Sequence, residues 1–159
     1  LDANRRVDRA LNTSPLPSPP PLHLHTLPPY LPLFNHIPIP QRFKANAGAL
    51  LGADQVTESG HRSGSTDMGD ISHVMPTLHP YMGGATGSGH GADYTIIDPK
   101  LAYLEPAKQL ALMAVDLLWE DAAGARDILE GFTPRLTKDA YLSFQRSVSR
   151  TETYDATNL

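Results

Sequence analysis

GHRSGSTDMGDISHVMPTLHPYMGGATGSGHGADYTIIDP, residues 60–99, is the stretch that decides the fold of this chain. Its first part, residues 60–91, holds eight of the twelve glycines and four of the seven histidines, and Pro76 and Pro80 interrupt it. Glycine and proline at this density favour loops, and loops held on a rigid scaffold are where functional sites usually lie. Residues 71–78 alternate apolar and polar at first, which predicts one short strand that meets Pro76.

An apolar helix is predicted directly after this stretch. Residues 106–120, PAKQLALMAVDLLWE, begin with Pro106, whose missing backbone donor would be unpaired at the first helical position anyway. Only Lys108, Gln109 and Asp116 are polar before Trp119, so most of the circumference is apolar. We therefore expect a core helix that is largely buried.

Shorter helices are predicted on both sides. Apolar residues recur at helical spacing, and capping or helix-breaking residues stand at the ends, in residues 2–12, 41–51, 125–132 and 137–148. The last residues, 151–159, are polar and are expected to be a flexible tail.

A proline-rich segment precedes residue 41. Ten of the fifteen prolines lie between residues 15 and 40, and each fixes its own φ and removes a donor. We expect neither a helix nor a central strand there, but a polyproline II linker or an irregular crossing segment; a docking peptide for a proline-recognising module is the alternative. His23 and His25 would lie on one side of an extended chain, where two imidazoles alone make a weak metal site.

Composition excludes several classes of function. The net charge of -4 and the absence of a basic run argue against a nucleic-acid partner. The chain has no cysteine, which excludes disulfides, thiolate metal sites and a cysteine nucleophile. No stretch approaches the roughly 20 apolar residues of a membrane span. We expect a protein of the cytoplasm in which histidines and carboxylates carry any metal chemistry.

The run GSTDMGDISHVMPTLHP, followed by a glycine-rich loop with a single histidine and then the apolar helix, resembles peptidase family M-twenty, the zinc aminoacylases, carboxypeptidases and dipeptidases. Within it the chain resembles the amidohydrolases related to aminobenzoyl-glutamate hydrolase and the Xaa-Arg dipeptidases. The resemblance implies an α/β fold, the carboxyl-terminal part of a three-layer αβα catalytic domain. Residues 1–28 would be a remnant of the inserted lid or dimerisation domain with the proline-rich segment, 29–150 catalytic domain, and 151–159 the tail.

The resemblance also implies site residues. His90 in GSGHGADY matches the last zinc ligand of the family, with Gly89 and Gly91 leaving room for the substrate to approach. Thr66 and Asp67 match a motif near the site, where they would orient it or bind substrate; without the resemblance, a polar turn of this kind caps the next element.

The other histidines of this stretch are weaker candidates for site residues. His73 and His79, beside prolines and apolar residues, are expected to be structural. His61, before Arg62, is a weaker candidate for contact with a substrate carboxylate.

Most of the family's catalytic residues have no match. None of the seven histidines is followed two residues later by Asp, and no two glutamates are adjacent, so the H-x-D ligand motif and the Glu-Glu pair with the general base are absent. The intact enzyme would hold two zinc ions and hydrolyse amide bonds of N-acyl amino acids or dipeptides. This chain alone would be inactive.

Two alternatives stay open: a non-catalytic interaction protein, which binds a partner or a homologue through the proline-rich segment or a truncated face, and a product of a split gene without a role of its own. Assembly into a homo-oligomer is not decided by the sequence.

Overall fold

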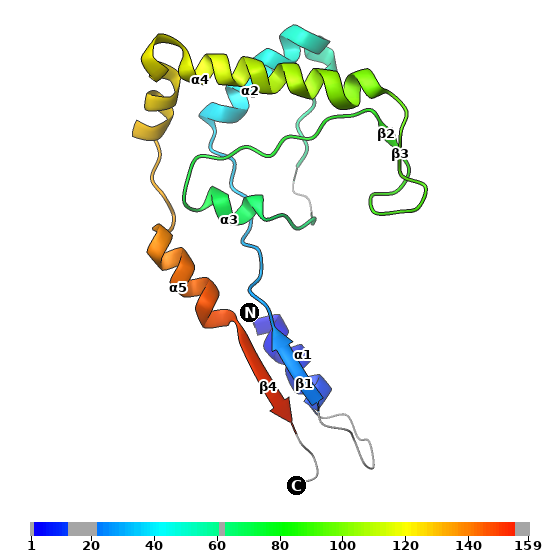
Figure 1. Ribbon diagram of the computed structural model, residues 1–159, viewed down its shortest axis with the longest axis vertical. Coiled ribbons are helices and arrows are strands. Elements are labelled where there is room, and N and C mark those ends of the chain that lie inside the picture. Colours follow the sequence, from blue (N-terminus) through cyan, green and yellow to red (C-terminus); the bar gives the residue numbers. More distant parts are fainter. Residues whose placement is uncertain (1, 13–21, 61–62, 155–159) are drawn as a thin grey trace. The chain divides into compact units, whose positions relative to one another are not determined.

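The computed structural model describes residues 2–12, 22–60 and 63–154, and these belong to two compact units. The first unit combines residues 1–29 with 137–159, and the second is Tyr30–Leu136 (Figure 1). Both ends of the chain therefore contribute to one unit, and residues 60–99 lie within the other.

The first unit is built on a two-stranded antiparallel ribbon. Strand β1 (Leu22–Thr26) pairs with β4 (Arg150–Tyr154), and His23 lies opposite Thr153 while His25 lies opposite Thr151. Helices α1 (Asp2–Asn12) and α5 (Lys138–Val148) complete the unit. These bounds confirm the helices predicted for residues 2–12 and 137–148.

Polar contacts tie distant parts of this unit together. The guanidinium of Arg150 contacts the carboxylate of Asp8 at 2.7 Å and that of Glu152 at 2.8 Å. The hydroxyl of Thr137 accepts the backbone N–H of Ala140 at 3.1 Å and caps α5. The guanidinium of Arg150 thus links β4 with α1, to which Asp8 belongs.

Two expectations for this unit were wrong. We expected a polyproline II linker or an irregular crossing segment between residues 15 and 40, but residues 22–26 form β1, because LHLHT contains no proline and every backbone donor is available for pairing. Residues 151–154, expected to be a flexible tail, form β4 instead, and their backbone pairs with β1.

The second unit consists of helices with very little sheet. Its elements are α2 (Pro38–Leu51), a 3-10 turn (Ala53–Gln55), α3 (Met68–Ser72), β2 (Ala85–Thr86), β3 (Thr95–Ile96), a π-helical turn (Lys100–Leu104) and α4 (Glu105–Glu130). The helix predicted for residues 41–51 is confirmed and begins three residues earlier, at Pro38. The strand predicted for residues 71–78 is wrong, because α3 and a turn occupy its first residues.

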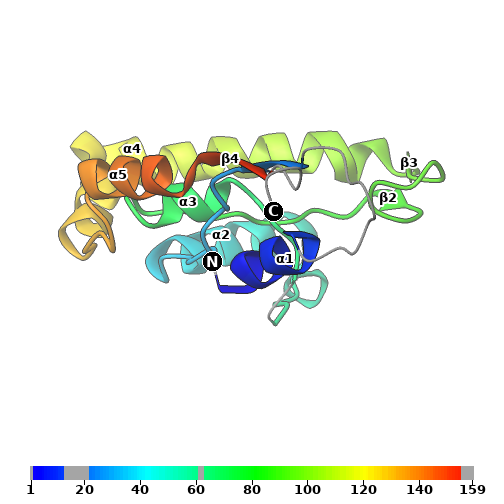
Figure 2. The same cartoon turned by 90° about the horizontal axis from the view of Figure 1, so that it is seen from below.

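Helices α2 and α4 pack against each other and run side by side in two perpendicular views (Figures 1 and 2). Ala47 of α2 and Met113 of α4 are buried. Between the helices, the amide of Asn46 donates to Asp116 at 2.6 Å, and that of Gln109 donates to the carbonyl of Phe43 at 3.2 Å. These polar contacts fix the alignment of α2 with α4 around a small apolar core.

Helix α4 is two helices joined by a reversal. Residues 119–122 leave helical geometry, and Glu120, Asp121 and Ala122 adopt the left-handed region, with φ of 50°, 58° and 60°. Gly124 follows, and a Cβ there would collide with the carbonyl of Asp116. The two helices predicted for residues 106–120 and 125–132 are therefore confirmed as separate segments.

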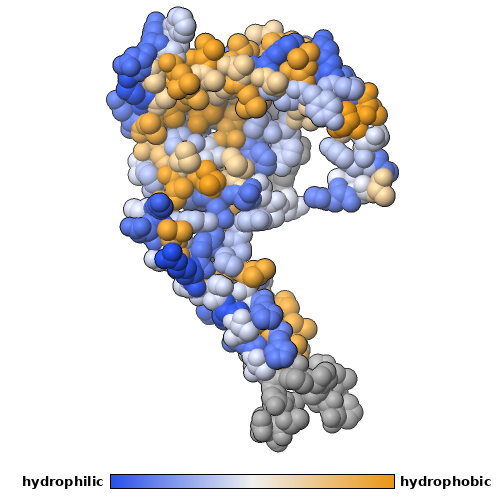
Figure 3. Space-filling view, viewed as in Figure 1, coloured by the Kyte–Doolittle hydropathy of each residue, from blue (hydrophilic) through white to orange (hydrophobic). Residues whose placement is uncertain are grey.

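The expected burial of the first segment is wrong. Its buried residues, Glu105, Gln109 and Met113, follow one stripe at intervals of four, and Gln109 and Met113 contact residues of α2. Large apolar side chains on the rest of its surface are exposed: Leu110 to 71%, Val115 to 54%, Leu118 to 67% and Trp119 to 69%. Figure 3 shows apolar side chains gathered over α4. We refer to these four residues as the apolar face of α4.

Mixed helices and small antiparallel sheets are compatible with the α/β class. The three-layer arrangement and the lid remnant stay predictions.

Candidate functional site

His90, the predicted zinc ligand, lies on the loop that joins β2 to β3. Its side chain is exposed, and its backbone adopts the left-handed region at φ 65°, which is uncommon for a residue other than glycine. The N–H of Gly91 donates to the carbonyl of Ser88 at 2.8 Å, and the N–H of Ser88 donates to the carboxylate of Asp93. These bonds form a tight turn that presents the imidazole at its tip.

The small residues beside His90 have unequal roles. A Cβ at Gly89 would meet nothing within 4 Å, whereas one at Gly91 would collide with the carboxylate of Asp93. A side chain at position 91 would thus disturb the contact of Asp93 with Ser88, and the predicted roles of Gly89 and Gly91 towards a substrate stay predictions.

Thr66 and Asp67 lie immediately before α3. The hydroxyl of Thr66 accepts the N–H of Met68 at 3.3 Å and lies 3.4 Å from Oδ1 of Asp67. Asp67 is exposed and forms no side-chain bond that caps α3. The bond of Thr66 is a local turn contact before α3, and the predicted roles of Thr66 and Asp67 towards a substrate stay predictions.

The residues of this motif with the clearest structural role are ones that the sequence did not single out. Asp70 and Ser72 are buried, and they accept the backbone N–H groups of Leu31 and Phe34 at 2.8 and 3.0 Å. Gly69 lies so close to Leu31 that a Cβ would collide with its carbonyl oxygen. The spacing G-D-x-S was the available signal: a small residue beside two short polar ones suits close contact with a neighbouring backbone.

The other three histidines of residues 60–99 differ from one another. His73 is structural, because its Nε2 lies 3.0 Å from the carbonyl of Pro32 and its ring packs edge-on against Phe34. His79 packs against Tyr81, but its Nδ1 is buried without a hydrogen-bond partner. His61 lies outside the described residues.

Within the described ranges, no three histidine, aspartate or glutamate side chains come close enough to hold a metal ion. His90 therefore has no second and third ligand among them, and these residues do not by themselves fit a dinuclear zinc centre.

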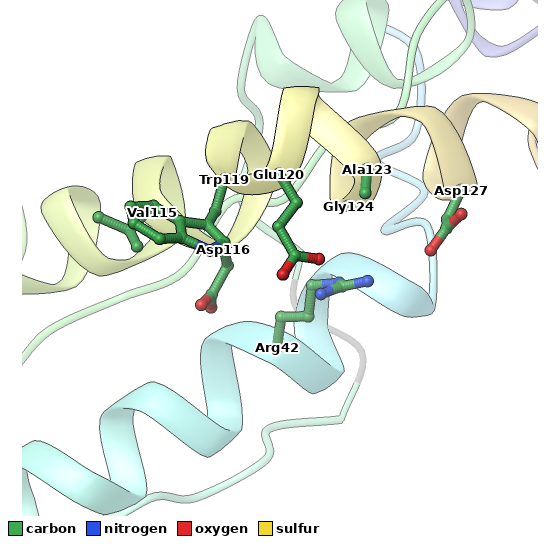
Figure 4. Close-up of a pocket in the computed structure, with 8 residues that line it drawn as sticks. All are labelled: Arg42, Val115, Asp116, Trp119, Glu120, Ala123, Gly124 and Asp127. Carbon is green, nitrogen blue, oxygen red and sulfur yellow. The ribbon is translucent and has the colours of Figure 1, made fainter.

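An open hollow of about 500 Å³ lies between α2 and the reversal in α4 (Figure 4). Arg42 reaches from α2 towards the carboxylate of Glu120, with Asp116 and Asp127 on either side. Trp119 forms part of the wall. The hollow is acidic overall, and none of the predicted site residues lines it.

Comparison with known proteins shows a similarity to a dipeptidase. Human Xaa-Arg dipeptidase is 29% identical over 120 residues, which cover 69% of this chain and 27% of that protein. The chain thus spans about a quarter of the length of the relative it matches. No protein-family profile matches the chain, and no solved structure matches it. In the part of the chain that the structure describes, no helix has the length and apolar character needed to cross a membrane.

Proposed function

We propose that this chain is the carboxyl-terminal part of a peptidase or amidohydrolase that hydrolyses dipeptides or N-acyl amino acids. The similarity to human Xaa-Arg dipeptidase over 120 residues is the observation that carries this proposal. The chain would contribute one part of the active site, and by itself it would be inactive because the general base and the other ligands lie outside it.

In this proposal His90 is the residue that the chain contributes to a zinc centre. Two features support it. The side chain of His90 is exposed on a tight turn, and a Cβ at the neighbouring Gly89 would meet nothing within 4 Å. Neutral imidazole is a good zinc ligand, but one such ligand holds a zinc ion only when other residues complete the coordination.

Loop exchange would test this role. The eight residues 87–94 would replace the matching residues of human Xaa-Arg dipeptidase, and bound metal and dipeptide hydrolysis would be measured in the folded chimera. We expect the chimera to hydrolyse dipeptides, and its His90→Ala variant to lose most of its bound metal and its activity. Asp93→Asn is the control for damage to the turn, because Asp93 supports the loop without being a predicted ligand. Full metal content and activity after His90→Ala would exclude the assignment.

The apolar face of α4 favours a second candidate, a non-catalytic interaction protein. Among the described residues, only Ala47, Met113, Ile128 and Val148 are buried apolar side chains, while large apolar ones on α4 are exposed. Contiguous apolar surface on a soluble protein marks a binding site or a face that a larger fold covers. Light scattering after size-exclusion chromatography separates the candidates: a monomer that binds no homologue would speak against the interaction protein.

A further inference from the structure

The paired strands β1 and β4 hold two histidines in an arrangement suited to a metal ion. His23 and His25 alternate along β1, so they lie on the same side of the ribbon, and both are exposed. Their partners across the ribbon are Thr153 and Thr151. This site is separate from the loop of His90, which belongs to the other unit of the chain.

Both imidazoles are bound through the same ring nitrogen. Nδ1 of His23 lies 3.0 Å from the hydroxyl oxygen of Thr153, and Nδ1 of His25 lies 3.1 Å from that of Thr151. A hydroxyl oxygen can accept Nδ1–H, and in that tautomer the lone pair is on Nε2. Histidines that ligate metals are held in the same manner, with the second ring nitrogen donating to a neighbouring oxygen.

We propose that His23 and His25 together chelate one divalent transition-metal ion through their Nε2 atoms, with water in its remaining positions. Alternate residues of a strand have Cα atoms about 6.6 Å apart, and a metal bound to two imidazoles at about 2.1 Å requires nitrogens within roughly 4 Å of each other. His23 and His25 lie on the same side of β1, so small rotations of their side chains can bring the two Nε2 atoms within this distance.

The ligand set selects the class of metal. Imidazole nitrogen favours Ni²⁺, Cu²⁺ and Zn²⁺, whereas Mg²⁺ and Ca²⁺ require several oxygen ligands. Glu152, the carboxylate on the facing strand, alternates with Thr151 and Thr153 and so lies on the other side of the ribbon, where it contacts Arg150. The histidine side of the ribbon therefore offers two imidazole nitrogens, both from β1, and no carboxylate from either strand.

The threonines would act as positioning residues. Each hydroxyl limits the rotation of one imidazole, so less conformational freedom is lost when the metal binds. Thr151→Val and Thr153→Val keep the β-branched shape of the side chain but remove the oxygen, and they should weaken binding without abolishing it.

Ni²⁺ titration of the full chain by isothermal calorimetry would test the site. We expect one ion per chain, and a loss of affinity of roughly tenfold or more in either His23→Ala or His25→Ala, because the second ligand binds the held ion as an intramolecular step. His79→Ala is the matched control with a histidine removed elsewhere, and it should keep the affinity of the unaltered chain.

A chemical measurement keeps the proposal testable if a variant folds poorly. Modification of the unaltered chain by diethyl pyrocarbonate, followed by peptide mass spectrometry, should show His23 and His25 protected together by Ni²⁺ while His90 stays reactive. Unchanged Ni²⁺ affinity in both His23→Ala and His25→Ala, or a titration that shows two independent weak sites, would overturn the proposal. So would equal protection of all exposed histidines. None of these results depends on whether the chain derives from a hydrolase.

Discussion

The carboxylate of Asp70 accepts the backbone N–H of Leu31 at 2.8 Å, across 39 residues of sequence. Asp70 is only 8% exposed. The bond joins the middle of α3 to the first residues of the second unit, so a residue of the motif that suggested an active site has a structural role.

Asp70→Ala should lower the free energy of unfolding by about 2 kcal/mol, since the N–H of Leu31 would lose a charged acceptor in a buried place. Urea unfolding followed by circular dichroism measures the change. Asp67→Ala is the control, because this carboxylate is exposed and should change stability by no more than about 0.5 kcal/mol. Equal effects of the two substitutions would contradict the structural role of Asp70.

Gly69→Ala should destabilise the same contact by a different mechanism. The added methyl group would collide with the carbonyl oxygen of Leu31, which is backbone and cannot move aside cheaply. We expect a loss of about 1–3 kcal/mol in the same unfolding measurement. Gly64→Ala, at a position with nothing within 4 Å, is the matched control and should have little effect.

The reversal within α4 predicts a stabilising substitution. Ala122 has φ 60°, a conformation that is unfavourable by roughly 1–2 kcal/mol for a residue with a Cβ and free of that cost for glycine. After the greater chain entropy of glycine in the unfolded state is subtracted, Ala122→Gly should raise the free energy of unfolding by about 0.5–1 kcal/mol.

Ala111→Gly is the control for this substitution, and it should have the opposite sign. Ala111 is exposed within the regular part of α4, where glycine costs about 1 kcal/mol relative to alanine. A loss of stability in both variants would show that residues 119–122 do not adopt the left-handed region in solution.

These results show how far the sequence could predict the fold. The helices were predictable because apolar spacing and helix-breaking residues are local signals, as in α5, which begins one residue after the predicted start and ends at the predicted residue. Strand β1 was missed because prolines on both sides outweighed the five residues between them. Its partner, β4, lies more than a hundred residues away, and no local pattern indicates such a pairing.

The candidate site was less predictable than the fold. The position of His90 on a glycine-rich loop was predicted, but the left-handed backbone and the bonds of Asp93 depend on the geometry of the turn. Leu110 was expected to be buried but is exposed. The spacing of apolar residues shows which face of a helix is apolar, but it does not show whether another part of the fold covers that face.

The ion pair between Lys44 and Glu58 predicts a dependence on pH and salt. The Nζ of Lys44 lies 2.6 Å from the Glu58 carboxylate, and this hydrogen bond, followed by the positive charge itself, lowers the pKa of Glu58 below its ordinary value. A lowered pKa in the folded state favours folding above the unfolded pKa, and this contribution is lost as the pH falls through the folded pKa.

Lys44→Gln should therefore raise the pKa of Glu58 towards its ordinary value, as measured by NMR titration of the Glu58 side-chain carboxyl carbon. Both side chains are largely exposed, so 1 M NaCl should bring the Glu58 pKa of the unaltered chain closer to its ordinary value. The Glu58 pKa of the variant should hardly change with salt. A pKa that is identical in the two proteins at low salt would contradict the ion pair.

The two sides of α4 should respond differently to substitution. Met113 is buried against α2, so Met113→Ala should lower the free energy of unfolding by about 2 kcal/mol or more. Leu118 is 67% exposed, so Leu118→Gln should change it by no more than about 0.5 kcal/mol and should reduce the binding of the dye ANS to the folded chain. A large loss of stability in Leu118→Gln would mean that another copy of the chain, or another part of it, covers this face in solution. Repeating the unfolding at several protein concentrations separates these two explanations, because only association between copies makes the midpoint rise with concentration.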